Sequence, residues 1–101
     1  MKIAIIVNLS KPKAVACADS ICNLLYENGA QLCALKDCED YLEFEQIEYF
    51  DNIDALFAFC DIAVTVGGDG TIIHAAKYAA AADKPLIGVN VGRLGFAADL
   101  E

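Results

Sequence analysis

The sequence has few basic residues, no tryptophan and one histidine. Seven lysines and arginines stand against fifteen aspartates and glutamates, which gives a formal net charge of -8 at pH 7. A nucleic-acid surface needs clustered cations to neutralise phosphates, so this scarcity argues against DNA or RNA as a partner. Anionic small molecules stay possible, because glycine-loop amides and helix N-termini can bind phosphate without basic side chains.

Long apolar runs are absent as well. No stretch approaches the roughly 20 apolar residues of a membrane helix. The opening run, Ile3 to Val7, is too short for the apolar core of a signal peptide, and Asn8 interrupts it. With 101 residues and 57% hydrophobic content, the chain fits one domain with one core. We expect a soluble protein with no membrane partner.

The cysteines form no CxxC pair. They are odd in number and lie among apolar residues, whereas zinc sites normally show tight paired spacing. We therefore expect buried thiols, no metal ligands from the chain, and a reducing, cytoplasmic location. The five cysteines are Cys17, Cys22, Cys33, Cys38 and Cys60.

Apolar periodicity predicts strands that alternate with helices. Ser10 is expected to cap the first helix and Gly29 to end it. Such alternation implies parallel strands with right-handed crossovers, so the expected fold is a single α/β, Rossmann-like three-layer domain over residues 1–101, with a mostly parallel sheet. The expected strands cover residues 2–7, 30–35, 61–66 and 86–90, and the expected helices cover 13–28, 52–59 and 71–82.

Residues 36–51 give no secure assignment. Seven carboxylates surround six apolar and aromatic residues there, without the ligand spacing of a calcium loop. The segment is therefore interpreted as a solvated acidic face, with a carboxylate metal site as the alternative.

The stretch "VTVGGDGTIIHAA", residues 64–76, carries the functional signal. Its glycines lie at the carboxyl end of an expected parallel strand, where ligands of open sheets bind. Glycines let a phosphate approach the backbone, and the following helix N-terminus attracts anionic oxygens. Asp69 would repel that phosphate unless a cation intervenes or the carboxylate takes a proton. In the alternative interpretation, Asp69 or Thr71 only caps the helix.

Other phosphate-binding fingerprints fit badly. There is no GxxxxGK[ST], and Ile73 occupies the third small position of GxGxxG. "GGDGT" at 67–71 together with "PLIGVNVGRLGF" at 85–96 instead resembles the N-terminal domain of the NAD kinases. GGDG alone is also similar to the loops of diacylglycerol and sphingosine kinases and of phosphofructokinases. Residues 36–60 contain nothing diagnostic.

The resemblance implies transfer of a phosphoryl group from ATP, or from polyphosphate, to the adenosine 2′-hydroxyl of NAD, which gives NADP. It also implies Mg²⁺ on the triphosphate and a homo-oligomeric full-length enzyme. Asp69 would be the catalytic base, and His74 would contact the dinucleotide or else occupy a solvated helix face. The implied nucleotide-binding residues are Gly67, Gly68, Asp69, Gly70, Thr71 and His74.

The second motif supplies the other wall of the implied cleft. Arg93, the only arginine, is interpreted as a rim residue, with a bidentate phosphate contact as the alternative. The residues that match the wall are Asn90, Gly92, Gly95 and Phe96.

The chain departs from the family in length. The resemblance implies an all-β second domain, which residues 1–101 lack, so we expect little or no kinase activity from this chain alone and an apolar surface that favours self-association. Two alternatives stay open: a lipid-kinase-like domain, and a non-catalytic nucleotide-binding α/β module in which Asp69 is only a cap.

Overall fold

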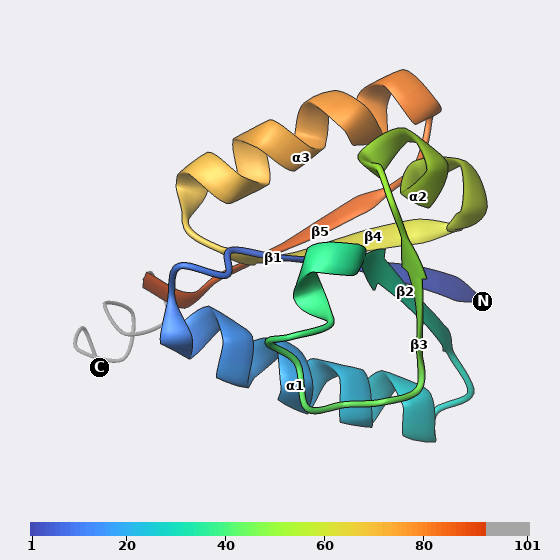
Figure 1. Cartoon of the computed structure of the whole chain (residues 1–101). Coiled ribbons are helices and arrows are strands. Elements are labelled where there is room, and N and C mark those ends of the chain that lie inside the picture. The colour runs from blue at the N-terminus through green and yellow to red at the C-terminus, as the bar shows by residue number, and fades with distance from the viewer. Residues whose placement is uncertain (93–101) are drawn as a thin grey trace.

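Five parallel strands form one sheet in the computed structural model, which describes residues 1–92 (Figure 1). The strand order is β3-β2-β1-β4-β5, and every pairing is parallel. The α/β, Rossmann-like class expected from the sequence is thus confirmed. The strands are β1 (Lys2–Val7), β2 (Gln31–Leu35), β3 (Ile47–Phe50), β4 (Ile62–Gly67) and β5 (Leu86–Asn90).

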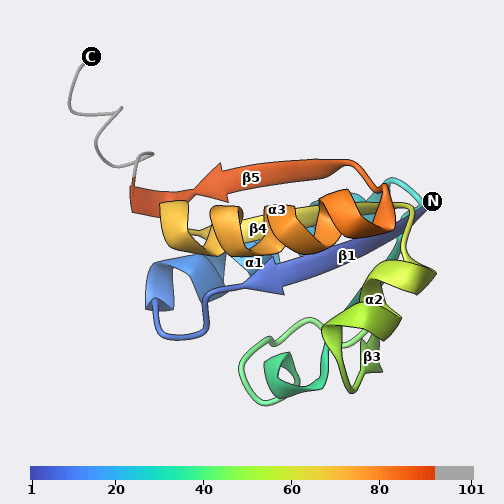
Figure 2. The ribbon, with the colours of Figure 1, turned by 90° about the horizontal axis from the view of Figure 1, so that it is seen from above.

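Helices cover both faces of the sheet. Helix α1 (Pro12–Glu27) lies on one face, and α2 (Ile53–Phe59) and α3 (Asp69–Ala82) lie on the other (Figures 1 and 2). From β1 the chain moves outward to β2 through α1, whereas from β4 it moves the opposite way to β5 through α3. The order of the strands therefore reverses between β1 and β4.

The central strand β1 explains the apolar opening of the sequence. Ile3 and Ile5 pack on the α1 side, while Ala4 and Ile6 pack on the side of α2 and α3. Because both faces are covered, consecutive positions are apolar rather than alternating. Each large aliphatic side chain buried in this way contributes about 1.5–3 kcal/mol to folding.

The segment 36–51 contains a strand that the sequence pattern did not predict. A short 3₁₀ turn, η1 (Lys36–Cys38), follows β2, and β3 then pairs in parallel with β2 at the edge of the sheet. The sequence analysis predicted four strands, whereas the structure has five within residues 1–92. The expected solvated face is present, because its carboxylates are exposed. They belong to Asp37, Glu39, Asp40, Glu43, Glu45, Glu48 and Asp51.

The starts of two helices also differ from expectation. Ser10 does not cap α1: Lys11 is the N-cap, without a side-chain hydrogen bond, and the Ser10 hydroxyl instead donates to Asn8 Oδ1 at 2.6 Å. Helix α3 begins at Asp69, two residues earlier than expected. Gly29 does follow the end of α1, with the left-handed φ of 90° that favours glycine there.

The cysteines are free thiols, and four of the five are buried, as expected; Cys17 is half-buried. Burial is the main cause that raises the pKa of Cys22 to about 12 and of Cys38 to about 11. Within residues 1–92, no helix has both the length and the apolar character needed to cross a membrane.

Candidate functional site

The candidate site lies where the carboxyl ends of β1 and β4 meet. The backbone N–H of Asn8, just past β1, donates to the carbonyl of Val66 in β4 at 2.9 Å. Beyond this link the chain leaves β1 toward α1 on one face and leaves β4 toward α3 on the other. Ligands of open parallel sheets bind in the crevice at such a reversal of strand order.

Gly67, the last residue of β4, is required by packing. A Cβ there would lie 2.7 Å from Thr71 Oγ1 and 3.0 Å from Asn8 Cβ. The absence of a side chain therefore allows the first turn of α3 and the loop after β1 to approach each other closely. The nucleotide-binding role expected for Gly67 is not needed to explain why glycine stands there.

Gly68 and Gly70 are not required by packing. A Cβ on Gly70 would meet nothing within 4 Å, and one on Gly68 would meet only the Lys11 side chain, with Nζ at 3.1 Å. Neither residue has a positive φ. Among the glycines within residues 1–92, only Gly29 has one. The space above Gly70 is therefore open to a ligand, and the space above Gly68 holds only the end of the flexible Lys11 side chain.

Asp69 is exposed at the head of α3, and Asn90 Nδ2 donates a hydrogen bond to its Oδ1. The two residues are brought together by the β4–β5 register, which pairs Gly67 with Asn90. The N-cap of α3 is Gly68, so the N-cap residue provides no side-chain capping hydrogen bond. The alternative in which Asp69 or Thr71 merely caps α3 is thus not what the structure contains.

A pocket of about 520 Å³ extends from the glycine loop. It brings together three of the residues expected at the site, Gly70, Thr71 and His74. His74 is exposed in the second turn of α3, where its ring lies edge-on to Tyr78 with centroids 5.3 Å apart. The remaining lining residues are Ile6, Val7, Asn8, Leu9 and Asp37.

Sequence reasoning missed Asn8, Lys11 and Asp37. Each follows the carboxyl end of a strand, Asn8 and Lys11 after β1 and Asp37 after β2, so each belongs to the edge of the sheet that holds the glycine loop. Polar residues in the loops that follow buried parallel strands are the signal that would have found them. Arg93, Gly95 and Phe96 lie outside the described residues, whereas Gly92 is described and exposed.

The part of the chain that the structure describes contains no group of three or more His, Cys, Asp or Glu side chains that could hold a metal ion. Asp69 is the carboxylate at the loop, and Asp37 lines the adjoining pocket. Mg²⁺ prefers several oxygen ligands. This donor set therefore fits a cation carried by the phosphates of a nucleotide better than one held by the protein.

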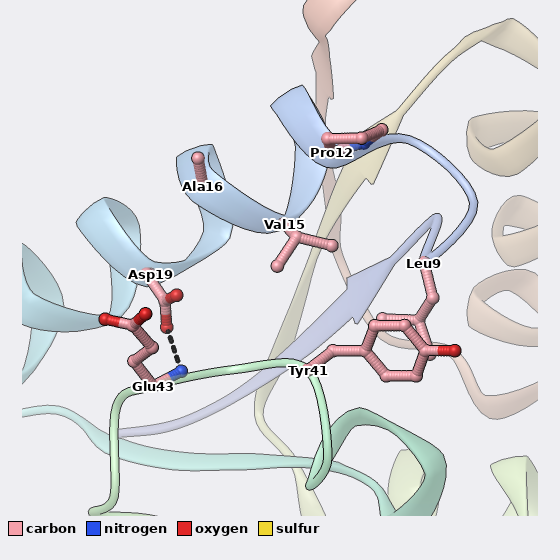
Figure 3. Close-up of a pocket in the computed structure, with 7 residues that line it drawn as sticks. All are labelled: Leu9, Pro12, Val15, Ala16, Asp19, Tyr41 and Glu43. Carbon is pink, nitrogen blue, oxygen red and sulfur yellow. Dashed lines mark hydrogen bonds between the residues drawn. The ribbon is translucent and has the colours of Figure 1, made fainter.

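A second pocket, of about 550 Å³, lies between α1 and the loop that leads to β3 (Figure 3). Asp19 anchors this loop to α1, because its Oδ1 accepts hydrogen bonds from the backbone N–H groups of Glu43 and Phe44 at 2.9 and 3.1 Å. The carboxylates of Asp19 and Glu43 line this pocket, and no glycine among its lining residues leaves the backbone open to a phosphate, as Gly70 does in the glycine-loop pocket. The glycine-loop pocket is therefore the better candidate for phosphate chemistry.

Comparison with known proteins agrees with the geometry. A family model described as ATP-NAD kinase N-terminal domain matches residues 3–101. The chain is 36% identical over 101 residues to an NAD kinase of Prosthecochloris aestuarii, with 98% of this chain and 33% of that protein covered. It is 32% identical over 103 residues to an NAD kinase of Bacteroides fragilis, with 99% of this chain and 36% of that protein covered. The chain thus spans about a third of the length of the curated relatives it matches.

Proposed function

The chain belongs to the NAD kinase family, and we propose that it supplies the glycine-loop wall of an active site that phosphorylates the adenosine 2′-hydroxyl of NAD. The donor is ATP or polyphosphate, and the product is NADP. One observation carries the proposal: an exposed carboxylate, Asp69, stands between two glycines that no backbone or core atom crowds, at the point where the strand order reverses.

The loop is suited to hold the phosphates of the donor. The first N–H groups of a helix have no partner within the helix. In α3, the helical hydrogen bonds begin with the one that Ile72 N–H donates to the carbonyl of Gly68 at 3.2 Å. The preceding N–H groups, of Asp69, Gly70 and Thr71, lie at the positive end of the helix dipole. We propose that they bind phosphate oxygens over Gly68 and Gly70, with the Thr71 hydroxyl beside them.

Asp69 acts as the general base in this proposal. As the 2′-oxygen of NAD forms a bond to the terminal phosphorus, its proton moves to a carboxylate oxygen of Asp69, and the bond from that phosphorus to the bridging oxygen of the donor breaks. Asn90 holds the carboxylate in place through its hydrogen bond to Oδ1. Mg²⁺ carried by the donor would neutralise phosphate charge. Alignment and charge stabilisation supply most of the catalysis in phosphoryl transfer.

His74 completes the proposed dinucleotide contacts. It lines the pocket one turn beyond Gly70, so its exposed ring can reach a substrate bound along the loop. This chain forms only one wall of the cleft, and a reaction between two bound substrates needs both walls to bring them together. We therefore propose that the chain alone has little or no activity.

A coupled assay for NADP formation from NAD, ATP and Mg²⁺ tests the function. It is run on the 101-residue chain and on the gene product that contains it, extended to the natural stop codon. We expect activity in the extended polypeptide only. Absence of NADP formation in both would refute the assignment, and equal rates in both would refute the need for a second wall.

A further inference from the structure

Lys11 reaches across the crevice from the loop that joins β1 to α1. Its backbone is fixed on both sides: its N–H donates to the carbonyl of Asn8 at 3.1 Å, and its own carbonyl accepts from Ala14 and Val15 at 3.0 and 3.2 Å. From this base the side chain extends to the glycine loop of β4. Its Nζ lies 3.1 Å from the point that a Cβ of Gly68 would occupy.

Within residues 1–92, the fold makes no use of this ammonium group. Lys2 places its Nζ 4.6 Å from the centroid of the Phe59 ring, and Lys84 donates from Nζ to the carbonyl of Cys60. Lys11, by contrast, is exposed and forms no ion pair through its side chain with any of residues 1–92. Its position over Gly68 therefore has no structural explanation within that range.

The charge balance of the site shows what the ammonium can do. The chain carries a formal net charge of -8, and Asp69 and Asp37 both stand at the glycine loop or its pocket. These carboxylates repel a polyanion, and the first turn of α3 offers only the partial positive charge of its amides. A full positive charge beside Gly68 offsets that repulsion where phosphate oxygens can approach the backbone most closely.

We propose that Lys11 is a phosphate-binding cation of this site and that its ammonium, beside Gly68, holds the non-bridging oxygens of the phosphoryl donor at the glycine loop. The ligand chemistry is a chain of linked phosphates, which a nucleoside triphosphate and inorganic polyphosphate share. That this ligand is a phosphoryl donor to NAD rests on the proposed function, whereas the contact itself requires only the phosphate chain.

Lysine footprinting on the full chain tests the contact without any turnover. The amines are acetylated with a limiting amount of an N-hydroxysuccinimide ester, and the extent of reaction at each lysine is read by peptide mass spectrometry. Sodium tripolyphosphate, ATP with Mg²⁺, or sodium sulfate at matched ionic strength is present in turn. We expect tripolyphosphate, ATP or both to slow acetylation of Lys11 several-fold. Lys77, which is exposed on α3, the helix that follows the glycine loop, should keep its rate of acetylation.

The arms of the experiment separate the two sources of phosphate. Protection by tripolyphosphate shows that the phosphate chain suffices, and protection by ATP alone shows that the nucleoside is also needed; both support the contact. An unchanged rate at Lys11 with every probe, or the same slowing at Lys77 or with sulfate, would overturn it. Because no NADP is formed in this assay, its outcome is independent of the proposed function.

Charge removal in the extended polypeptide gives a second readout. Lys11→Gln keeps most of the aliphatic stem and should raise the KM for ATP roughly tenfold or more, since it removes a charge-assisted hydrogen bond to phosphate. Lys77→Gln removes the same charge elsewhere and should leave KM unchanged. A KM for Lys11→Gln within about twofold of the parent value would contradict the role of Lys11 while leaving the assignment as a kinase intact.

Discussion

Glycine serves two purposes within four consecutive residues of the loop. Gly67 lacks a side chain because Thr71 and Asn8 occupy the space that a Cβ would need. Gly68 and Gly70 have that space and leave it unfilled by any backbone or core atom. The sequence motif identifies the loop but treats all three glycines alike, because the difference depends on residues that only the folded chain brings near.

This difference makes Gly70→Ala a clean test of function. Alanine should leave the free energy of unfolding unchanged or raise it by about 0.5–1 kcal/mol, because glycine weakens helix interiors. The methyl group would, however, occupy the proposed phosphate space, so NADP formation by the extended polypeptide should fall by about tenfold or more. Urea unfolding and the coupled assay measure the two effects. Full activity in a well-folded Gly70→Ala variant would show that no ligand approaches this residue.

Thr65 offers a second test at the scale of one residue. It is fully buried in β4, and its hydroxyl has no hydrogen-bond partner among the described residues. Thr65→Val keeps the shape and removes the unsatisfied group, so the free energy of unfolding should rise by about 1 kcal/mol. Thr71→Val, at a half-buried position, is the control and should give no gain. A loss of stability in Thr65→Val would show that the hydroxyl has a partner.

The sequence predicts elements with a long, regular apolar pattern well, but it does not predict a strand that depends mainly on its pairing with a neighbour. The continuous apolar runs of β1 and β4 and the three-four spacing of α1 show in the sequence because each is buried in a regular way. Strand β3 has four residues and no clean alternation; its main support is its ladder to β2. Such support comes from a distant segment, and local propensity does not encode it.

The contact between α3 and β5 depends on one missing side chain. A Cβ on Gly88 would lie 3.0–3.2 Å from three side-chain atoms of Ile72. Gly88→Ala should therefore lower the free energy of unfolding by about 1–3 kcal/mol through overpacking. Ile72→Val removes the nearest atom, so the double variant should lose less than the sum of the two single changes. Strict additivity in urea unfolding would show that the two residues do not compete for space.

For the whole molecule, the buried thiols set the response to alkaline pH. Burial, the largest cause in each case, raises the pKa of Cys33 to about 12 and of Cys38 to about 11, from the ordinary thiol value of 9.0. Unfolded thiols lose protons above about pH 9 while the folded ones stay neutral, so unfolding releases protons and stability falls as pH rises through that range. Below pH 9 this contribution is fully present.

Urea titrations at a series of pH values check this expectation. The unfolding midpoint should stay level from about pH 7 to about pH 8 and fall by about pH 10. Cys38→Ala should reduce the steepness of that fall, because the buried Cys38 thiol contributes to it. A midpoint that does not move between these pH values would contradict the burial of the thiols.

The site as a whole could be predicted only in part. Asp69, Gly70, Thr71 and His74 are neighbours in sequence, so one motif identifies them together. Asn8 and Lys11 lie more than fifty residues earlier and reach the loop only because β1 pairs with β4. Alternation of strands and helices predicts a parallel sheet but not the order of its strands, and that order decides which loops meet.

The central claim, that Asp69 is the base of an NAD kinase, is tested most directly by Asp69→Asn in the extended polypeptide. Asparagine keeps an oxygen that can accept the hydrogen bond from Asn90, so the loop should keep its geometry. Turnover to NADP should fall by about 100-fold or more, while binding of NAD and ATP stays within about threefold. Turnover within about threefold of the parent, with binding intact, would contradict the claim.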